Sequence, residues 1–223
     1  MRTIWGIILL IFCFSNLSAQ ENAGLDPNYL EDQVFLSLTY NVLNNKPVSI
    51  SQNALSGGVS FGFIKDIPLN AERNIGFGIG LGYAYNTYVQ NLKISRDNQI
   101  TLFEQAQDFS TNRLRMHSLE LPIEFRWRTS TLQKYKFWRI YGGLKLSYLF
   151  SVKTTFSDEF ETKSTKNIPE LNTFQYGLTM AAGYSTWNVY VYYGLSSLFK
   201  GAEFDGDKLD LSNFKIGLKF YML

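Results

Sequence analysis

The stretch NIGFGIGLGYAY, residues 74–85, constrains the fold more than any other part of the sequence. Large apolar side chains alternate there with glycine or alanine, and a period of two indicates a β-strand. Glycine weakens an ordinary strand because it offers no side chain for packing. A strand that keeps four glycines on one face therefore indicates a sheet with one bulky apolar face and one face that has very little room.

Seven further segments alternate in the same way, and no segment has a sustained helical period. The connections after the first, third, fifth and seventh segments are longer than the other three, as in outer-membrane barrels with long external loops and short periplasmic turns. The sequence thus predicts an all-β, eight-stranded antiparallel up-and-down transmembrane β-barrel with both termini in the periplasm. The eight segments span residues 34–42, 55–64, 74–89, 117–128, 137–151, 173–185, 187–196 and 213–223.

A soluble barrel is the main alternative, and two features argue against it. The less apolar face is mostly Gly, Ser, Thr, Asn and Tyr, which suits a narrow lumen better than a water-exposed exterior rich in Lys and Glu. With the up-and-down order imposed, the aromatic residues also fall into two bands, as expected at the two lipid–water interfaces. The expected outer band is Tyr40, Tyr83, Tyr85, Tyr148, Phe150 and Phe174, and the expected periplasmic band is Phe63, Trp127, Trp138, Tyr184, Trp187 and Phe220.

The N-terminus has the composition of a secretory signal peptide. Arg2 precedes the apolar run IWGIILLIFCF, which is too short for a transmembrane helix, and small residues follow up to Ala19. We therefore expect a signal peptide over 1–19, a periplasmic lead-in over 20–33 and the barrel domain over 34–223. The only cysteine, Cys13, lies in the apolar run, so the processed chain should contain no disulfide and no cysteine-based metal site.

Charged residues on the less apolar face should lie in the lumen. Buried charges must pair to recover their desolvation cost, so they predict a structural ion network; a path for a solute or for protons is the alternative. A symmetric turn over 129–136 would pair Glu120 with Lys145, Glu124 with Tyr141 and Trp127 with Trp138, although a slip of two residues would keep the same faces. The predicted lumen charges are Glu120, Glu124, Arg126, Arg128, Arg139, Lys145, Lys215 and Lys219.

We expect no catalytic site, no metal site and no cofactor. The only histidine, His117, is next to Ser118, and neighbouring strand residues point to opposite faces, so the two cannot form a nucleophile–base pair. Asp97, Glu104 and Asp108 of the long loop could reach the histidine, but a histidine in water at the barrel rim is the simpler interpretation. No metal-ligand spacing occurs, and a net charge of +2 gives no reason to expect a nucleic-acid partner.

The C-terminal stretch KIGLKFYM spans residues 215–222. It has a polar residue at Lys215, a glycine at Gly217, an aromatic residue at Phe220 and an apolar residue at Met222. This resembles the terminal-strand signal by which outer-membrane barrels are recognised by the insertion machinery. The two longest loops, 91–116 and 152–170, mix both charges with a few apolar residues. Such loops suit contact with a protein partner, although we expect them to be mainly solvated.

The segments LELPIEFRWR, RIYGGLKLSYLF, FQYGLTMAAGY and VYVYYGLSSLF resemble the PorT-type outer-membrane β-barrel family, best from His117 onward. The resemblance implies an outer-membrane barrel in a Gram-negative bacterium, with a structural or protein-interaction role in type IX secretion or envelope assembly. Outer-membrane lipid, the barrel insertion machinery and secretion or envelope proteins would then be its partners. An adhesin-like or ligand-binding barrel that uses its outer loops is an alternative, and an outer-membrane enzyme or narrow transporter is a further one.

Overall fold

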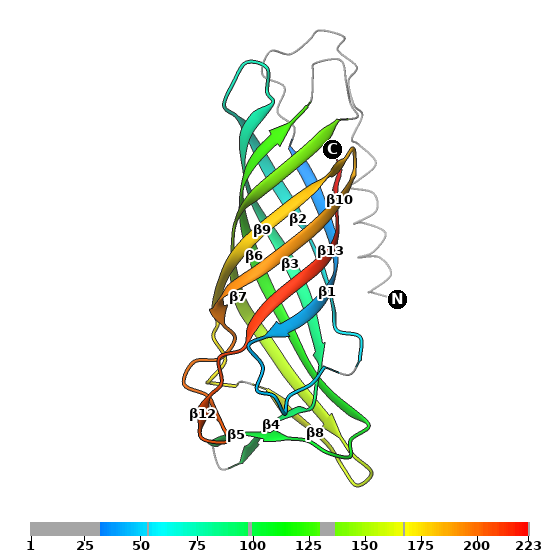
Figure 1. Ribbon diagram of the computed structural model, residues 1–223, viewed down its shortest axis with the longest axis vertical. Helices are drawn as coiled ribbons and strands as arrows, with labels where there is room; N and C mark the ends of the chain where they lie inside the picture. Colours follow the sequence, from blue (N-terminus) through cyan, green and yellow to red (C-terminus); the bar gives the residue numbers. More distant parts are fainter. Residues whose placement is uncertain (1–31, 53, 98–99, 130–136, 167, 223) are drawn as a thin grey trace, which may run out of the picture.

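The protein is an eight-stranded antiparallel barrel, as the alternation predicts; the structure is a computed structural model and describes residues 32–52, 54–97, 100–129, 137–166 and 168–222. Sequential strands pair as neighbours, and the β1–β13 and β6–β7 pairings complete the closed wall (Figure 1). The wall strands are β1 (Gln33–Asn44), β2 (Gly57–Pro68), β3 (Ile75–Val89), β6 (Thr111–Arg128), β7 (Trp138–Ser157), β9 (Phe174–Tyr184), β10 (Trp187–Ser197) and β13 (Ser212–Met222).

The two ends of the barrel differ. The start of β1 and the end of β13 lie at one end, which we call the turn end because the connections over 69–74, 129–137 and 185–186 are short. The opposite loop end carries the long connections 45–56, 90–110, 158–173 and 198–211 and five short strands (Figure 1). These are β4 (Leu92–Asp97), β5 (Ile100–Gln105), β8 (Thr162–Lys166), β11 (Glu203–Phe204) and β12 (Asp207–Lys208).

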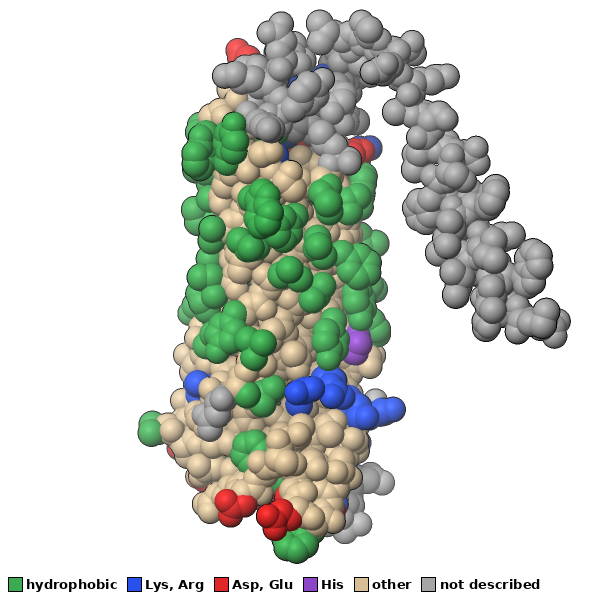
Figure 2. Space-filling model, turned by 90° about the vertical axis from the view of Figure 1, so that its right-hand side faces the viewer, with side chains coloured by type: hydrophobic (Ala, Val, Ile, Leu, Met, Phe, Trp, Pro, Cys, Tyr) green, Lys and Arg blue, Asp and Glu red, His purple; other side chains and the backbone are tan. Residues whose placement is uncertain are grey.

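Large apolar side chains point away from the barrel axis. In β3, Phe77, Ile79 and Leu81 are 44–62% exposed to the surroundings of the barrel. Figure 2 shows apolar side chains spread over most of the wall, with the charged side chains near its two ends. A continuous apolar exterior of this kind fits hydrocarbon. In the part of the chain that is described, no helix is long and apolar enough to cross a membrane.

The glycines of β3 leave space for bulky side chains inside the lumen. A Cβ added at Gly78 would lie 2.7 Å from the guanidinium carbon of Arg126, and one at Gly82 would lie 2.7 Å from the ring of Phe35. Both Arg126 and Phe35 are buried. The alternation of bulk and glycine in this strand is therefore explained by hydrocarbon on one side and a filled lumen on the other.

The predicted register between β6 and β7 is wrong by two residues. Glu120 lies opposite Ser147, Glu124 opposite Gly143 and Trp127 opposite Ile140, so Trp127 does not pair with Trp138. A shift of two leaves every side chain on its predicted face. Closer to the loop end, His117 pairs with Ser151 but Ser118 pairs with Leu149, so β7 has one extra residue, a β-bulge. Beyond this bulge, the residues of β7 that would have pointed inward point outward, and the reverse.

The long loops are more structured than the expectation of mainly solvated loops allows, although many of their side chains are exposed. Strands β6 and β7 begin and end beyond the predicted segments, at Thr111 and Ser157, and project past the barrel mouth (Figure 1). Strands β4 and β5 form a hairpin, β8 pairs with the end of β7, and β11 pairs with β12. Apolar residues that are scattered in the sequence of these loops come together in a buried core, described below.

Candidate functional site

A cluster of ion pairs fills the lumen near the turn end. Arg126 donates from Nη1 to Asp66 Oδ1 at 2.9 Å, and Arg128 donates from Nη2 to Asp66 Oδ2 at 2.6 Å. Arg128 also donates from Nε to the carbonyl oxygen of Arg73 at 2.6 Å. Asp66, Arg126 and Arg128 are at most 2% exposed, so one carboxylate joins β2 to two arginines of β6. Hydrogen bonds between two charged groups, as here, are among the strongest in proteins.

Glu124 connects this cluster to the closing strand. Its Oε2 accepts from Nη2 of Arg126 at 3.1 Å, and its Oε1 accepts from Nζ of Lys219 at 2.7 Å. The hydroxyl of Tyr221 donates to the same Oε1 at 3.1 Å. Lys219 and Tyr221 belong to β13, so Glu124 ties β6 to a strand across the lumen.

Arg139 lies among aromatic rings instead of carboxylates. Its guanidinium carbon is 4.6 Å from the ring centre of Phe137, 5.5 Å from that of Tyr221 and 5.8 Å from that of Tyr141. Within the described residues, Nε and Nη1 of Arg139 have no hydrogen-bond partner. Cation–π contacts stabilise a desolvated guanidinium in such a place.

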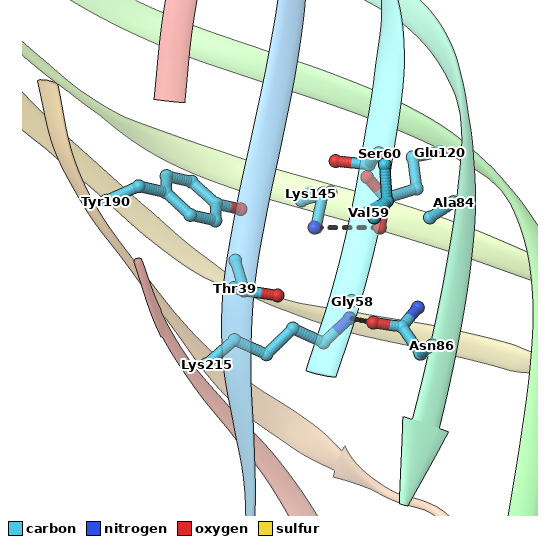
Figure 3. Close-up of a pocket in the computed structure, with 10 residues that line it drawn as sticks. All are labelled: Thr39, Gly58, Val59, Ser60, Ala84, Asn86, Glu120, Lys145, Tyr190 and Lys215. Carbon is cyan, nitrogen blue, oxygen red and sulfur yellow. Dashed lines mark hydrogen bonds and ion pairs between the residues drawn. The ribbon is translucent and has the colours of Figure 1, made fainter. Parts of the chain in front are cut away.

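A second polar cluster lies nearer the loop end (Figure 3). Lys145 donates from Nζ to Glu120 Oε1 at 2.8 Å, although the two residues are diagonal and not opposite in the strand register. Lys215 donates from Nζ to Asn86 Oδ1 at 2.9 Å, and Asn41 donates to the same oxygen at 3.1 Å. Glu120, Lys145, Asn86 and Lys215 line a small cavity with room for about one water molecule.

The lumen is therefore packed and charged, with an excess of cations. Tyrosine rings lie beside several of the cations, including Tyr192 at 4.5 Å from Nζ of Lys145 and Tyr141 at 4.7 Å from the guanidinium carbon of Arg126. Side chains that fill an eight-stranded barrel leave no aqueous channel. The buried charged residues of the described chain are the carboxylates Asp66, Glu120 and Glu124 and the cations Arg126, Arg128, Arg139, Lys145, Lys215 and Lys219.

We expect Glu120→Ala to weaken the barrel without opening a channel. The substitution leaves Lys145 without its carboxylate, but the rings of Tyr190 and Tyr192 and the second cluster still fill the cross-section. Single-channel recordings in planar bilayers should show no steady conductance for the wild type or for the variant. Stable porin-like openings in either protein would contradict a closed lumen.

The long connections form a second structural unit, which we call the loop cap. Its apolar core draws on all four connections and on the adjoining strand ends, and it lies at the loop end of the barrel (Figure 1). Hydrogen bonds join the connections: Ser51 donates its backbone N–H to Asn91 Oδ1 at 2.7 Å, and Asn91 donates to the carbonyl oxygen of Ser49 at 2.9 Å. The core residues are Leu43, Ile50, Tyr88, Leu92, Ile94, Leu114, Met116, Leu149, Ile168, Leu171, Leu198, Phe199, Ala202, Phe204, Leu209 and Leu211.

His117 lies on the outer face of β6 and not in the lumen. Its Nδ1 is 2.6 Å from the hydroxyl oxygen of Tyr83, and the rings of Tyr85 and Phe150 lie 5.0 and 6.2 Å away. Ser118 is buried on the opposite face. The histidine therefore belongs to an aromatic band at the level of the barrel mouth.

The C-terminal motif residues divide between the two faces of β13, with Lys215 and Gly217 on the inner face and Phe220 and Met222 on the outer face. Lys215 is buried in the lumen, and Gly217 faces Thr39 and Tyr190 across the two neighbouring strands. Phe220 packs on the outside against Trp187, with ring centres 4.8 Å apart, and Met222 is 41% exposed. Whether the insertion machinery recognises this strand stays a prediction.

Sequence reasoning missed two groups of site residues. Asp66, which binds two arginines, continues the two-residue period of β2 beyond Ile64, so a longer reading of that strand would have placed it inside. Asn86, which accepts a hydrogen bond from Lys215, likewise continues the two-residue period of β3 on the inner face. The loop cap has no such signal, because its core joins short apolar stretches from four connections that are distant in sequence.

Among the described residues, no three His, Cys, Asp or Glu side chains are grouped so that they could hold a metal ion. No curated protein sequence matches the chain significantly. A family model does match: the outer membrane protein beta-barrel domain covers residues 18–200, most of the chain. With the closed eight-stranded wall and the apolar exterior already established, the match is decisive: this chain belongs to the outer membrane protein β-barrel domain family and is an integral barrel of the outer membrane.

Proposed function

We propose that this barrel is a closed, non-conducting anchor that presents its loop cap to protein partners of an envelope machine. The observation that carries the proposal is the buried apolar core shared by all four long connections. A barrel that served as a pore would need an open mouth, and solvated loops would need no core. A folded cap instead provides a fixed surface, which lowers the entropic cost of binding a partner.

We also propose that the loop end faces the cell exterior and that both termini are periplasmic. The long and short connections segregate to opposite ends of the barrel, as in other outer-membrane barrels. The tip of the β7–β8 hairpin is suited to a test, because Phe160 there is 92% exposed. A cysteine at position 160 should react with a membrane-impermeant maleimide in intact cells; reaction only after lysis would reverse the orientation.

The same hairpin tip has a defined shape and an acidic character. The backbone N–H groups of Phe160 and Glu161 donate to Asp158 Oδ1 at 2.9 and 2.8 Å. The hydrogen bonds from the backbone N–H groups of Glu161 and Phe160 hold the pKa of the Asp158 carboxyl below its ordinary value. Phe160 is therefore an exposed aromatic residue on a hydrogen-bonded turn, flanked by Glu159 and Glu161, a combination that suits protein contact.

The resemblance to PorT-type barrels supports type IX secretion or a related export process as the setting of this role. We propose no catalytic function. In support of that, His117 contacts Tyr83 on the outer face, away from Ser118, and Tyr190 and Tyr192 pack in the lumen beside Lys145.

Disrupting the loop cap should abolish the function and leave the barrel folded. Leu209 is 1% exposed in the cap core, so Leu209→Asp would bury an unpaired carboxylate there. Residues 90–110 should then become sensitive to protease, while the unboiled protein keeps the faster gel migration of a folded barrel. The neighbouring exposed Lys208→Asp is the matched control and should behave as wild type.

The cellular test is complementation of a deletion strain, scored by export of surface proteins. The wild type and Lys208→Asp should restore export, and Leu209→Asp should not. Full export with Leu209→Asp would contradict a role for the cap in export. Export that is normal even in the deletion strain, together with lost adhesion to surfaces, would favour the adhesin-like alternative.

A further inference from the structure

A row of basic side chains crosses three neighbouring strands at the loop end. Arg115 of β6 lies opposite Lys153 of β7, and Lys153 lies opposite Lys166 of β8. Arg113 is one pleat further along β6. Residues that are directly opposite on an antiparallel ladder share a face, so the side chains of Arg115, Lys153 and Lys166 are neighbours on one surface. We call these four residues the basic row.

The basic row faces outward. On β6 the intervening Leu114 and Met116 are buried in the loop cap, so Arg113 and Arg115 point to the other side. On β7 the bulge beside His117 exchanges the inward and outward positions, so Thr154 points inward and is buried. Its neighbour Lys153 therefore points outward. Without this bulge Lys153 would point into the cap.

The row has no acidic partner among the described residues. Its cations make no ion pair there, and the buried Nε of Arg113 has no hydrogen-bond partner. The nearby lysines Lys93 and Lys163 are paired with Glu104 and Glu161. Like charges that are directly opposite on a ladder destabilise it, so this arrangement favours a bound anion.

The row also lies at the edge of the lipid-facing band. His117 and Phe150 mark the aromatic level, and Arg115 is two residues further along β6, about 7 Å at the usual strand rise. In the opposite direction Leu119 is 46% exposed on the apolar wall. Figure 2 shows basic side chains gathered beside the single histidine, where the apolar surface ends. The row therefore lies at the height where lipid headgroups meet the barrel.

We propose that the basic row binds the phosphorylated sugar headgroup of an outer-leaflet glycolipid. The lipid's acyl chains would lie along the apolar wall beside Leu119, and its phosphates would be held between Arg115, Lys153 and Lys166. Arginine suits this role because its planar guanidinium binds phosphate oxygens in pairs. The choice of the outer leaflet rests on the proposed orientation of the loop end.

The test measures lipid binding to the full-length processed protein in detergent by native mass spectrometry. The probes are bisphosphorylated lipid A and the same lipid without phosphates. The test variant is Arg115→Gln/Lys153→Gln, and the matched control is Lys65→Gln/Lys200→Gln, which removes the same charge at two exposed lysines outside the row. We expect the test variant to bind the phosphorylated lipid at least about tenfold more weakly, the loss of one strong charged contact, and the control to bind as wild type.

Three results would overturn the proposal: equal binding of the dephosphorylated lipid, undiminished binding by the test variant, and displacement of the lipid by millimolar inorganic phosphate. The last result would indicate a site for free phosphate. Gel migration of the unboiled protein confirms that each variant is folded. Lipid binding in detergent does not depend on how the barrel is oriented in the membrane, whereas the labelling of position 160 does. A failure of the lipid-site proposal can therefore be distinguished from a failure of the proposed orientation.

Discussion

Replacing Glu124 with alanine is expected to lower the free energy of unfolding by about 3–5 kcal/mol, the usual cost of removing one partner from a buried ion pair. Glu124 binds Arg126, Lys219 and Tyr221 in a part of the lumen where all four side chains are at most 3% exposed. The variant leaves Lys219 without a carboxylate, and Asp66 remains as the acceptor for Arg126 and Arg128. Denaturant titration of the protein in detergent or vesicles, followed by gel migration, measures the loss.

The matched control for this variant is Glu203→Ala, which removes an exposed carboxylate in β11. It should change the stability by less than about 0.5 kcal/mol, as surface substitutions usually do. The double variant Glu124→Leu/Lys219→Leu should recover part of the lost stability, because a neutral pair has no unpaired charge. Equal stabilities for wild type and Glu124→Ala would mean that the lumen admits enough water to solvate the charges.

Adding a side chain at Gly143 is expected to be as damaging, at about 3 kcal/mol or more, because the space it needs is occupied by backbone. A Cβ at this position would lie 2.8 Å from the Cα of Glu124 on the neighbouring strand and would also contact the carbonyl of Ile123. Backbone cannot move aside without separating β6 from β7. We expect Gly143→Val to lose most of the folded gel form during refolding.

The adjacent Gly142 provides the control. It faces outward, and a Cβ there has only the carbonyl oxygen of Thr179 within 4 Å, at 3.9 Å. Gly142→Val should therefore refold like the wild type, since the new side chain enters the lipid-facing surface. If both valine variants refolded equally well, the narrow lumen would not be the reason for the small residues on the inner face.

The barrel itself could be predicted from the sequence because two independent patterns agree. Alternation over eight segments assigns each residue to a face, and the segregation of long and short connections orders the strands. The lumen charges follow from the same alternation, since Glu120 and Lys145 need only share a face to meet. In the observed register the two residues are not directly opposite but diagonal, and their long side chains still reach each other.

Register and loop structure could not be predicted in the same way. A shift of two residues between β6 and β7 keeps all faces, so the face pattern cannot detect it. The bulge at His117 depends on local backbone geometry, and it decides on which side Lys153 lies. The loop cap depends on contacts among four connections that are distant in sequence, such as the ring contact of Phe103 with Phe199 at 5.3 Å.

The most direct test of the whole account is the environment of Leu81, which is 62% exposed on β3. Cys13 is the only cysteine in the sequence, so a cysteine at position 81 can carry a single nitroxide once residues 1–19 are absent. In lipid vesicles, the account predicts strong relaxation by oxygen, which dissolves in hydrocarbon, and weak relaxation by a water-soluble nickel chelate. Strong relaxation by the nickel chelate, or weak relaxation by both, would place Leu81 in water or in a protein core and would contradict it.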